Sequence, residues 1–275
     1  MKKIIFNQEQ INDIIKDYTV NHLTLKEIGL KNNVSRTVIT RIIKENNIQI
    51  NTHHYYYADY NKFENIDSVE KAYWLGFIAA DGCNYSRKEN ASLIINIHQK
   101  DKKHLENFKV FMNSNVEIKD FIQSWGYSNE TPMSKIIFNS KKLSEDLSKI
   151  GIVPKKSLIL QPPKIKEEFY LPFILGYFDG DGSIYKTKQY NNFALSIEGT
   201  EEILKWIMQI LQVNLKLEKR YKDDKNNYCI RCGGTNKPYE ILKKLYESAE
   251  IHLDRKYKIF KELETVVFSR NIKDY

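Results

Sequence analysis

The stretch AYWLGFIAADGCN, residues 72–84, decides the fold of this chain, and FILGYFDGDGSI, residues 173–184, matches it. Both stretches are apolar, span about three helical turns and contain an Asp-Gly pair. Residues four apart lie on one face of a helix, so each predicted helix presents a strip of small residues. The two strips are Gly76 with Ala80 and Gly176 with Gly180. We expect the helices to pack closely along these strips.

Such packing brings Asp81 and Asp181 together at the C-terminal ends of the two helices. A helix C-terminus carries partial negative charge, so each aspartate is disfavoured there by roughly 0.3–1 kcal/mol, and the two also repel each other. One explanation is structural: Asp-Gly stops a helix, with Gly82 or Gly182 in the left-handed conformation. A matched pair of aspartates favours a divalent cation, because carboxylate oxygens are the ligands that Mg²⁺ prefers.

The same residues carry a resemblance to a known family. Trp74–Gly82 (WLGFIAADG) and Ile174–Gly182 (ILGYFDGDG) resemble the signature of the LAGLIDADG homing endonucleases. The copies stand 181 − 81 = 100 residues apart inside a duplicated frame, and the resemblance covers roughly residues 65–270. It therefore extends over about three quarters of the chain.

The acidic positions of the signature differ between the two copies. The second copy has Asp179 and Asp181, whereas the first has Ala79 and Asp81. In the family the last acidic residue is the essential one. The resemblance thus implies that alanine at position 79 leaves activity intact.

Composition limits the class of protein. The 275 residues include 43 Lys and Arg against 35 Asp and Glu, a net charge of +8 that suits a polyanionic partner. No run of 18 apolar residues is present, so we expect no membrane span. We expect a folded cytoplasmic protein of a bacterial, phage or organellar host.

The three cysteines, Cys83, Cys229 and Cys232, fit a reducing compartment. Cys229 and Cys232 form one C-x-x-C, but a structural zinc site needs about four ligands and no second suitable pair follows. Residues around them alternate like a strand, which would turn the two thiols to opposite faces. We expect ordinary strand cysteines, with a zinc site as the alternative.

Residues 1–50 are predicted to form a small all-α domain, and residues 51–66 a linker. The predicted helices are Gln8–Tyr18, Leu25–Lys31 capped by Thr24, and a third that Ser35 caps and that runs to about Glu45.

The sequence LTLKEIGLKNNVSRTVITRIIKENNI within this domain resembles the helix-turn-helix of resolvases and bacterial regulators. That motif sets its last helix in the DNA major groove. The residues that would contact bases are Arg36, Thr37, Thr40 and Arg41. The alternative is a plain three-helix bundle with a solvated basic face.

From Val69 onward the chain follows one α+β plan twice, in the order αββαββα. After the first signature we expect strands Cys83–Arg87 and Ala91–His98, helix Lys102–Met112 capped by Asp101, strands Val116–Ser124 and Met133–Phe138, and helix Lys141–Ile150. After the second we expect strands Ser183–Lys188 and Phe193–Glu198, helix Glu201–Leu211 capped by Thr200, strands Leu215–Tyr221 and Asn227–Arg231, and helices Pro238–Glu247 and Arg255–Val267. The predicted domains are residues 67–165 and 166–275.

The predicted strands alternate apolar and polar residues, so each antiparallel sheet has one face for helices and one for water or a partner. Two such sheets would form a basic saddle, and a β-ribbon can read the major groove. The candidate DNA-contacting residues are Tyr85, Arg87, Ser92, Asn96, Gln99, Tyr185, Thr187, Lys188 and Ser196. The alternative for each is a solvated polar side chain.

Hydrolysis of a phosphodiester needs an activated water and stabilisation of charge on phosphorus, which two metal ions about 4 Å apart can supply. Asp81 and Asp181 are the candidate ligands of Mg²⁺, or of another divalent cation such as Mn²⁺. The resemblance implies that the carbonyls of Ala80 and Gly180 also ligate metal. Each aspartate would then serve one DNA strand in a staggered cut.

Two lysines are candidates for a catalytic role beside the metal. Lys156 and Lys256 each follow their own aspartate by 75 residues (156 − 81 and 256 − 181) and match the family's lysine near the last helix of each half. The alternative is two surface lysines. Gln99 also resembles a family position that borders the active site. The second half has Glu198-Gly199-Thr200 at the corresponding place, so the resemblance does not imply the same role in both halves.

The sequence favours a monomeric, site-specific double-strand DNA endonuclease, with intron homing implied by the resemblance. One alternative is a DNA-binding regulator that has lost catalysis. Another is a maturase that binds intron RNA. The DNA target is not encoded in any pattern of the sequence.

Overall fold

The computed structural model describes residues 6–21, 23–48, 50, 56–87, 90–125, 129–188, 192–220, 225–247 and 249–271. Parts of the predicted linker and of the predicted turns at 88–90 and 189–192 lie outside these residues. The chain divides into two compact units, Met1–Ala58 with Asn113–Val116, and Asp59–Met112 with Glu117–Tyr275.

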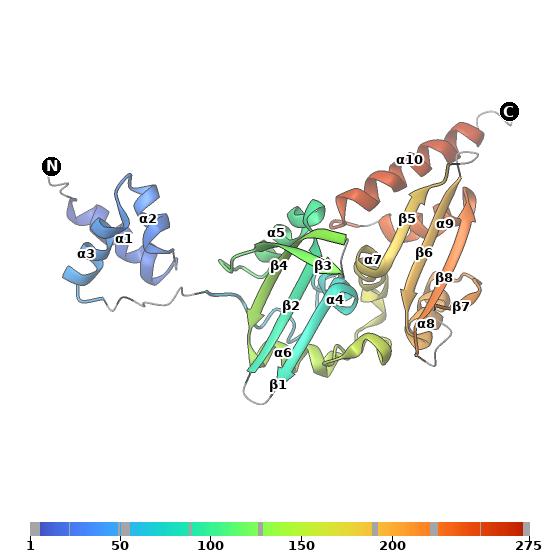
Figure 1. Ribbon diagram of the computed structural model, residues 1–275, viewed down its shortest axis with the longest axis horizontal. Coiled ribbons are helices and arrows are strands. Elements are labelled where there is room, and N and C mark those ends of the chain that lie inside the picture. Colours follow the sequence, from blue (N-terminus) through green and yellow to red (C-terminus); the bar gives the residue numbers. More distant parts are fainter. Residues whose placement is uncertain are drawn as a thin grey trace. The chain divides into compact units, whose positions relative to one another are not determined.

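The first unit has three helices in its described part, as the apolar spacing predicts. They are α1 (Gln8–Thr19), α2 (Leu25–Lys31) and α3 (Arg36–Glu45) (Figure 1). Ile14, Ile28 and Ile39 belong to their common core. Thr24 caps α2 as predicted. Ser35 precedes α3 but, contrary to the prediction, makes no cap hydrogen bond. Ser35 is exposed, so water can satisfy the free N–H groups of that helix end.

The turn between α2 and α3 is tight. Asn33 has a φ of 55°, and the Val34 N–H donates to the Gly29 carbonyl at 2.8 Å. A Cβ on Gly29 would lie 2.8 Å from the Val34 carbonyl oxygen. Glycine is therefore required at position 29 for the chain to turn back this closely.

The second unit repeats the predicted order αββαββα. Its first half consists of α4 (Val69–Asp81), β1 (Gly82–Arg87), β2 (Asn90–His98), α5 (Lys102–Phe111), β3 (Lys119–Trp125), β4 (Asn129–Asn139) and α6 (Lys141–Ile150). Its second half consists of α7 (Tyr170–Asp181), β5 (Gly182–Lys186), β6 (Phe193–Gly199), α8 (Glu201–Leu211), β7 (Leu217–Lys219), β8 (Tyr228–Gly234) and α9 (Asn236–Tyr246), and α10 (Asp254–Asn271) follows. Short 3₁₀ turns lie at Gln99–Asp101, Lys156–Leu158 and Glu167–Phe169.

Several local predictions need correction, among them a strand and a helix cap. Among the described residues the strand predicted over Leu215–Tyr221 covers only β7, which pairs with β8, and one further backbone hydrogen bond joins the Arg220 N–H to the Asn227 carbonyl at 3.0 Å. Asp101 makes no cap hydrogen bond with α5. Its carboxylate instead accepts two hydrogen bonds from Arg255, at 3.2 and 3.0 Å.

Each half contains one antiparallel sheet, and the two sheets have the same topology. The strand orders are β1-β2-β4-β3 and β5-β6-β8-β7. Leu93 and Ile95 in β2 are buried, as are Leu195 and Ile197 in β6, which confirms the predicted alternation. In Figure 1, α4 and α7 lie between the two sheets.

The close packing of α4 on α7 follows from the predicted strips of small residues. A Cβ on Gly76 would lie 1.9 Å from the Phe173 carbonyl oxygen, and a Cβ on Gly176 would lie 1.9 Å from that of Tyr73. Side chains at these positions would force the backbones apart. The two glycines therefore set the distance between the helices.

Gly82 and Gly182 do not adopt the left-handed conformation of a helix stop. Their φ angles are −78° and −88°, so the chain passes directly from helix into extended strand. Glycine is needed at both positions because a side chain would be too crowded. A Cβ on Gly82 would lie 2.6 Å from the Ile78 carbonyl oxygen, and a Cβ on Gly182 would lie 2.2 Å from the Phe178 ring.

Phe63, which falls in the predicted linker, is fully buried and contacts the Phe111 ring edge to face, at 5.7 Å between centroids. Residues near position 63 are therefore part of the second unit's core. Among the described residues, no helix combines the length and the apolar character that a membrane crossing requires.

Candidate active site

Asp81 and Asp181 are the last helical residues of α4 and α7. A Cβ on Gly180 would lie 2.3 Å from the Ala80 Cβ and 3.3 Å from Asp81 Oδ2. The first carboxylate thus lies against the backbone of the second helix, one residue before Asp181. Packing along the small residues brings the two aspartates to one place.

Both carboxylates have solvent access, Asp181 being exposed and Asp81 half-buried. Crowding by protein atoms nevertheless raises the pKa of Asp81 to about 7, through desolvation first and the charge of Asp181 second. Desolvation raises the pKa of Asp181 to about 6, and the charges of Lys156 and Lys256 oppose this shift. A cation bound between the carboxylates would relieve both effects.

Lys156 and Lys256 are buried rather than lying on the surface. Lys156 Nζ donates to the Ala80 carbonyl at 3.1 Å. Lys256 Nζ donates to the carbonyls of Phe178, Asp179 and Gly182, at 2.6, 2.7 and 2.6 Å. Burial lowers the pKa of both amines, that of Lys256 to about 8. Each ammonium stabilises the negative C-terminal end of a signature helix.

A buried polar chain beside Asp181 was not predicted from the sequence. Asp179 Oδ2 accepts from the Tyr73 hydroxyl at 2.6 Å and from the Leu253 N–H at 2.7 Å. The Tyr73 oxygen also lies 3.0 Å from His104 Nε2. Because Tyr73 donates its proton to the carboxylate, His104 is the donor to Tyr73. The chain joins α5, α4, α7 and the segment that enters α10.

His104 gives the fold a defined pH dependence. Burial lowers its pKa from 6.5 to about 4, so the folded value lies below the unfolded one. Its contribution to stability is complete above about pH 6.5 and is lost as the pH falls toward about 4. His104→Gln keeps an N–H donor for Tyr73 but cannot titrate, so its loss of unfolding free energy over this interval should be smaller, by up to roughly 3 kcal/mol. Urea unfolding at both ends of the interval measures this, and equal losses in the two proteins would contradict it.

The candidate DNA-contacting residues of the first half lie on β1, on β2 and in the turn after β2. Tyr85, Arg87, Asn96 and Gln99 are exposed. Ser92 pairs opposite Tyr85 and is buried, so its hydroxyl is poorly placed for direct contact.

In the second half, Tyr185 and Lys188 are exposed, whereas Thr187 and Ser196 are half-buried. The Thr187 hydroxyl donates to the Asn192 carbonyl at 3.1 Å. Tyr85 follows Asp81 by four residues and Tyr185 follows Asp181 by four, so the two halves present matched aromatic rings. Two of the candidates, Thr187 and Lys188, border an open hollow of ≈ 410 Å³; its lining residues are Thr187, Lys188, Asn192, Phe193, Ala194, Gly233 and Gly234.

Sequence reasoning missed Arg231, an exposed residue of β8 that pairs opposite Ser196. The Arg231 Nε donates to Cys229 Sγ at 3.3 Å, and this contact orients the guanidinium group. The alternation that selected Ser196 also runs along β8 and could have found Arg231. Cys229 and Cys232 stand three apart on this strand, so their thiols face opposite ways.

The candidates in the first unit lie on α3. Arg36, Thr37 and Arg41 are exposed. The half-buried Thr40 donates its hydroxyl proton to the Arg36 carbonyl at 2.8 Å, so it can offer a base only an acceptor. Arg41 Nε lies 3.7 Å from a Glu45 carboxylate oxygen. The exposed guanidinium groups therefore remain the main candidates.

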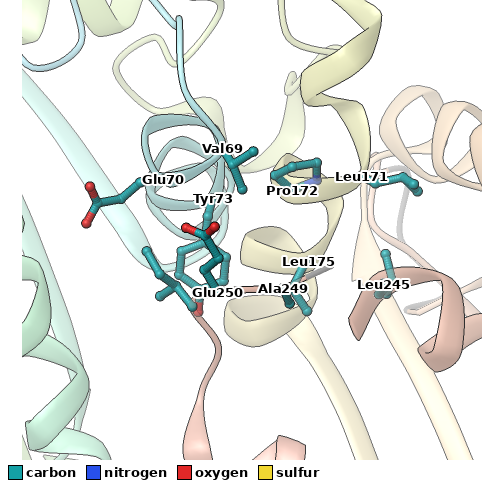
Figure 2. Close-up of a pocket in the computed structure, with 10 residues that line it drawn as sticks. Val69, Glu70, Tyr73, Leu171, Pro172, Leu175, Leu245, Ala249 and Glu250 are labelled. Atoms are coloured by element: carbon teal, nitrogen blue, oxygen red, sulfur yellow. The ribbon is translucent and has the colours of Figure 1, made fainter. Parts of the chain in front are cut away.

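A small apolar pocket of ≈ 20 Å³ lies at the other end of α4 and α7. Figure 2 shows Val69 and Tyr73 of α4 beside Leu171 and Leu175 of α7. Val69 begins the helix that Asp81 ends, so the pocket is roughly 18 Å from the carboxylates. Its volume is about that of one water molecule, and it has no part in the candidate site.

The oxygen atoms around the two aspartates fit a hard divalent cation. The pKa values of the two adjacent carboxylates stay raised although Lys156 and Lys256 oppose the shift, so these lysines compensate the negative charge only in part. The Gly180 carbonyl accepts no side-chain hydrogen bond from the described residues. In that part of the chain no group of three or more His, Cys, Asp or Glu side chains is placed to hold a metal, so backbone carbonyls or water must complete any such site.

Comparison with known proteins bears on the fold. Residues 168–255 match a family model described as a LAGLIDADG-like domain. The homing endonuclease I-WcaI, bound to its DNA recognition sequence, aligns with a TM-score of 0.50 at 17% identity, over 71% of this chain and 87% of that chain. A mutant of I-SmaMI aligns with a TM-score of 0.50 at 13% identity, over 74% and 92% of the two chains. A search of curated proteins gave no match.

The match to the LAGLIDADG-like domain model thus falls within the second half of the second unit. The two four-stranded antiparallel sheets and their helices have the fold of LAGLIDADG homing endonucleases. At these identities the structural likeness establishes the fold alone.

Proposed function

We propose that this chain, with its LAGLIDADG-like domain and homing-endonuclease fold, is a site-specific double-strand DNA endonuclease that requires Mg²⁺ or Mn²⁺. The observation that carries the proposal is the meeting of Asp81 and Asp181 at the ends of α4 and α7, with a buried lysine at each helix end. One aspartate would serve each strand, giving a staggered cut. Both halves belong to one chain, so a monomer suffices.

Each part of the site has a role in this reaction. The two carboxylates and the nearby carbonyls of Ala80 and Gly180 would hold the cation, which supplies an activated water and stabilises charge on the phosphate. Lys156 and Lys256 keep positive charge beside the carboxylates. The glycine-packed helices fix the distance between the carboxylates, so the site need not reorganise when DNA binds.

DNA would lie along the polar faces of the two sheets. Tyr85 and Tyr185 would contact the duplex at matched places in the two half-sites. Arg231 adds a guanidinium suited to the O6 and N7 acceptors of guanine. The two faces differ in sequence, so the target need not be palindromic.

We also assign the first unit a DNA-binding role as a helix-turn-helix, supported by the short turn at Gly29 and the exposed arginines of α3. Arg36→Ala with Arg41→Ala should weaken binding at least about tenfold and make its salt dependence shallower. Fluorescence anisotropy at several salt concentrations measures both quantities. Lys16→Ala with Lys26→Ala removes the same charge from α1 and α2 and should have a smaller effect. If both double variants lost the same DNA affinity, the first unit would attract DNA only through its net charge, and the helix-turn-helix role would be contradicted.

The nuclease proposal is tested with a supercoiled plasmid library carrying random inserts, incubated with the protein in Mg²⁺ or in EDTA. We expect Mg²⁺-dependent linear plasmids that share one insert sequence. Binding to a shared sequence without cutting would instead favour a regulator. Preferential binding of structured intron RNA, without DNA cutting, would favour a maturase.

A further inference from the structure

The two signature helices follow one plan, yet their ends are held differently. Positions 100 residues apart occupy matching places in α4 and α7, as Gly76 and Gly176 show. Several other matching pairs differ in residue type, and two of these differences concern polar groups in one hydrogen-bond chain: Tyr73 corresponds to Phe173, and Ala79 to Asp179. The hydrogen-bond chain through Tyr73 and Asp179 therefore exists on one side only.

Asp179 fastens the start of α10 to α7. Its Oδ2 accepts from the N–H of Leu253, the residue immediately before α10. Lys256 lies in the first turn of that helix and donates to three carbonyls at the end of α7. The carboxylate thus fixes the backbone from which Lys256 reaches the Asp181 end of the site.

The same carboxylate has further capacity for hydrogen bonding. Burial first, and the Asp179 carboxylate second, raise the pKa of the Tyr246 hydroxyl on α9, so the two side chains lie near each other. Asp179 Oδ1 and this hydroxyl are both buried, and neither makes a hydrogen bond to any other described residue. Asp179 is therefore placed to tie α9 as well as α10 to the end of α7.

Among the described residues the Asp81 end is held by a different arrangement: the buried Asn84 side chain donates to the carbonyl of Ile152, four residues before Lys156, at 2.7 Å. The Ala79 side chain has no oxygen that could accept from a backbone N–H. Lys156 stands in a three-residue 3₁₀ turn rather than on a long helix, and it follows Lys155, whose φ is 58°. Its Nζ donates to a single described carbonyl, that of Ala80. Lys156 is less firmly positioned than Lys256, because its ammonium has one carbonyl partner instead of three and its nearest such tie, at Ile152, lies four residues away.

We propose that Asp179 is a positioning residue for one of the two catalytic half-sites, and that it makes the strand served by Asp181 the first to be cut. The inference rests on the proposed nuclease function. Groups that folding has already oriented lower the barrier of the chemical step, whereas a loosely held group must be oriented at each turnover. The strand served by Asp81 is cut second, from a nicked intermediate.

The test uses a duplex recovered from the plasmid library, with a different fluorophore on each strand. Asp81→Asn identifies the strand that Asp181 serves, because only that strand should still be nicked. For the wild-type protein we expect this strand to be cut at least about fivefold faster than the other. Equal rates would overturn the inference and leave the nuclease proposal standing, whereas no cutting of any duplex would overturn both.

Three variants separate positioning from stability. Asp179→Ala introduces the residue found at the matching position 79. It should slow cutting of the strand served by Asp181 alone, so that the two strands are cut at similar rates. Asp179→Asn keeps an acceptor oxygen for Leu253 and should restore most of the bias. Tyr73→Phe copies Phe173 and should lower stability while keeping the bias. Equal slowing of both strands by Asp179→Ala would show a structural role only.

Hydrogen exchange gives a readout that does not depend on cutting or on metal. In the metal-free wild-type protein the Leu253 amide should be protected, and in Asp179→Ala it should exchange at least about tenfold faster. The Lys156 segment should be unaffected. A rapidly exchanging Leu253 amide in the wild type would contradict the inference even if the alanine variant failed to fold.

Discussion

Gly176→Ala should destabilise the second unit by more than about 3 kcal/mol and separate the two active-site carboxylates. An added Cβ would lie 1.9 Å from the Tyr73 carbonyl oxygen and 2.9 Å from the Phe77 nitrogen, both of them backbone atoms. In an isolated helix the same change would be favourable by about 1 kcal/mol, so the clash alone decides the sign. Urea unfolding followed by near-ultraviolet circular dichroism measures the effect.

Gly233→Ala is the matched control for this prediction. The nearest atom to a Cβ on Gly233 is the Phe193 carbonyl oxygen, at an ordinary 3.8 Å. Its unfolding free energy should stay within about 0.5 kcal/mol of the wild type. If Gly176→Ala were as stable as this control, the helices would not be packed on their glycines, and the shared site would lose its structural basis.

Asp81→Asn and Asp181→Asn should each reduce double-strand cleavage at least about a hundredfold while leaving DNA affinity within about threefold. Asparagine keeps the size of the side chain but removes the charge that would hold a cation. Gel assays of plasmid products and anisotropy of a labelled duplex measure the two quantities separately. Equal losses of binding and cutting would count against a catalytic role.

These two substitutions should not weaken the fold, unlike most changes at packed positions. In the metal-free protein the pKa values of Asp81 and Asp181 are about 7 and about 6, both above the ordinary 3.8. The folded state therefore retains protons that the unfolded chain has lost, and stability falls as the pH rises from about 4 to about 7. Above that interval each asparagine variant should unfold at a higher temperature than the wild type.

Asp67→Asn provides the control for both properties. Asp67 is an exposed carboxylate just before the other end of α4, paired with Lys71 at 2.8 Å. Its replacement removes the same charge far from the site, so cleavage should be unchanged and the melting temperature should not rise. A thermal shift of the same sign and size in all three variants would assign the effect to net charge rather than to the carboxylate pair.

The element order and the place of the aspartates could be predicted because they rest on local periodicity. Residues four apart share a helix face, and alternate residues share a sheet face, whatever lies across from them. Small residues at Gly76 and Gly176 allow a close approach of helices, and the duplicated spacing identified each as the other's partner. The ends of edge strands such as β7 were predicted less well, because pairing with β8 sets them.

The polar groups around the site could not be predicted, because their state depends on burial and on partners distant in the sequence. Asp179 could be recognised as a charge inside an apolar helix, which requires partners. Nothing in the sequence identifies Tyr73 and the Leu253 N–H, 106 and 74 residues away, as those partners. Arg231 likewise gains its place from strand register.

The sequence by itself determined which helices pair, which strand faces are buried and which two acids meet, since each follows from the spacing of residue types along one element. Only the tertiary structure decided that Lys156 and Lys256 are buried at helix ends, and that one half-site is more firmly held than the other. The reason is physical: desolvation and hydrogen bonding depend on every atom that packs around a group, whereas periodicity depends only on the chain that carries it.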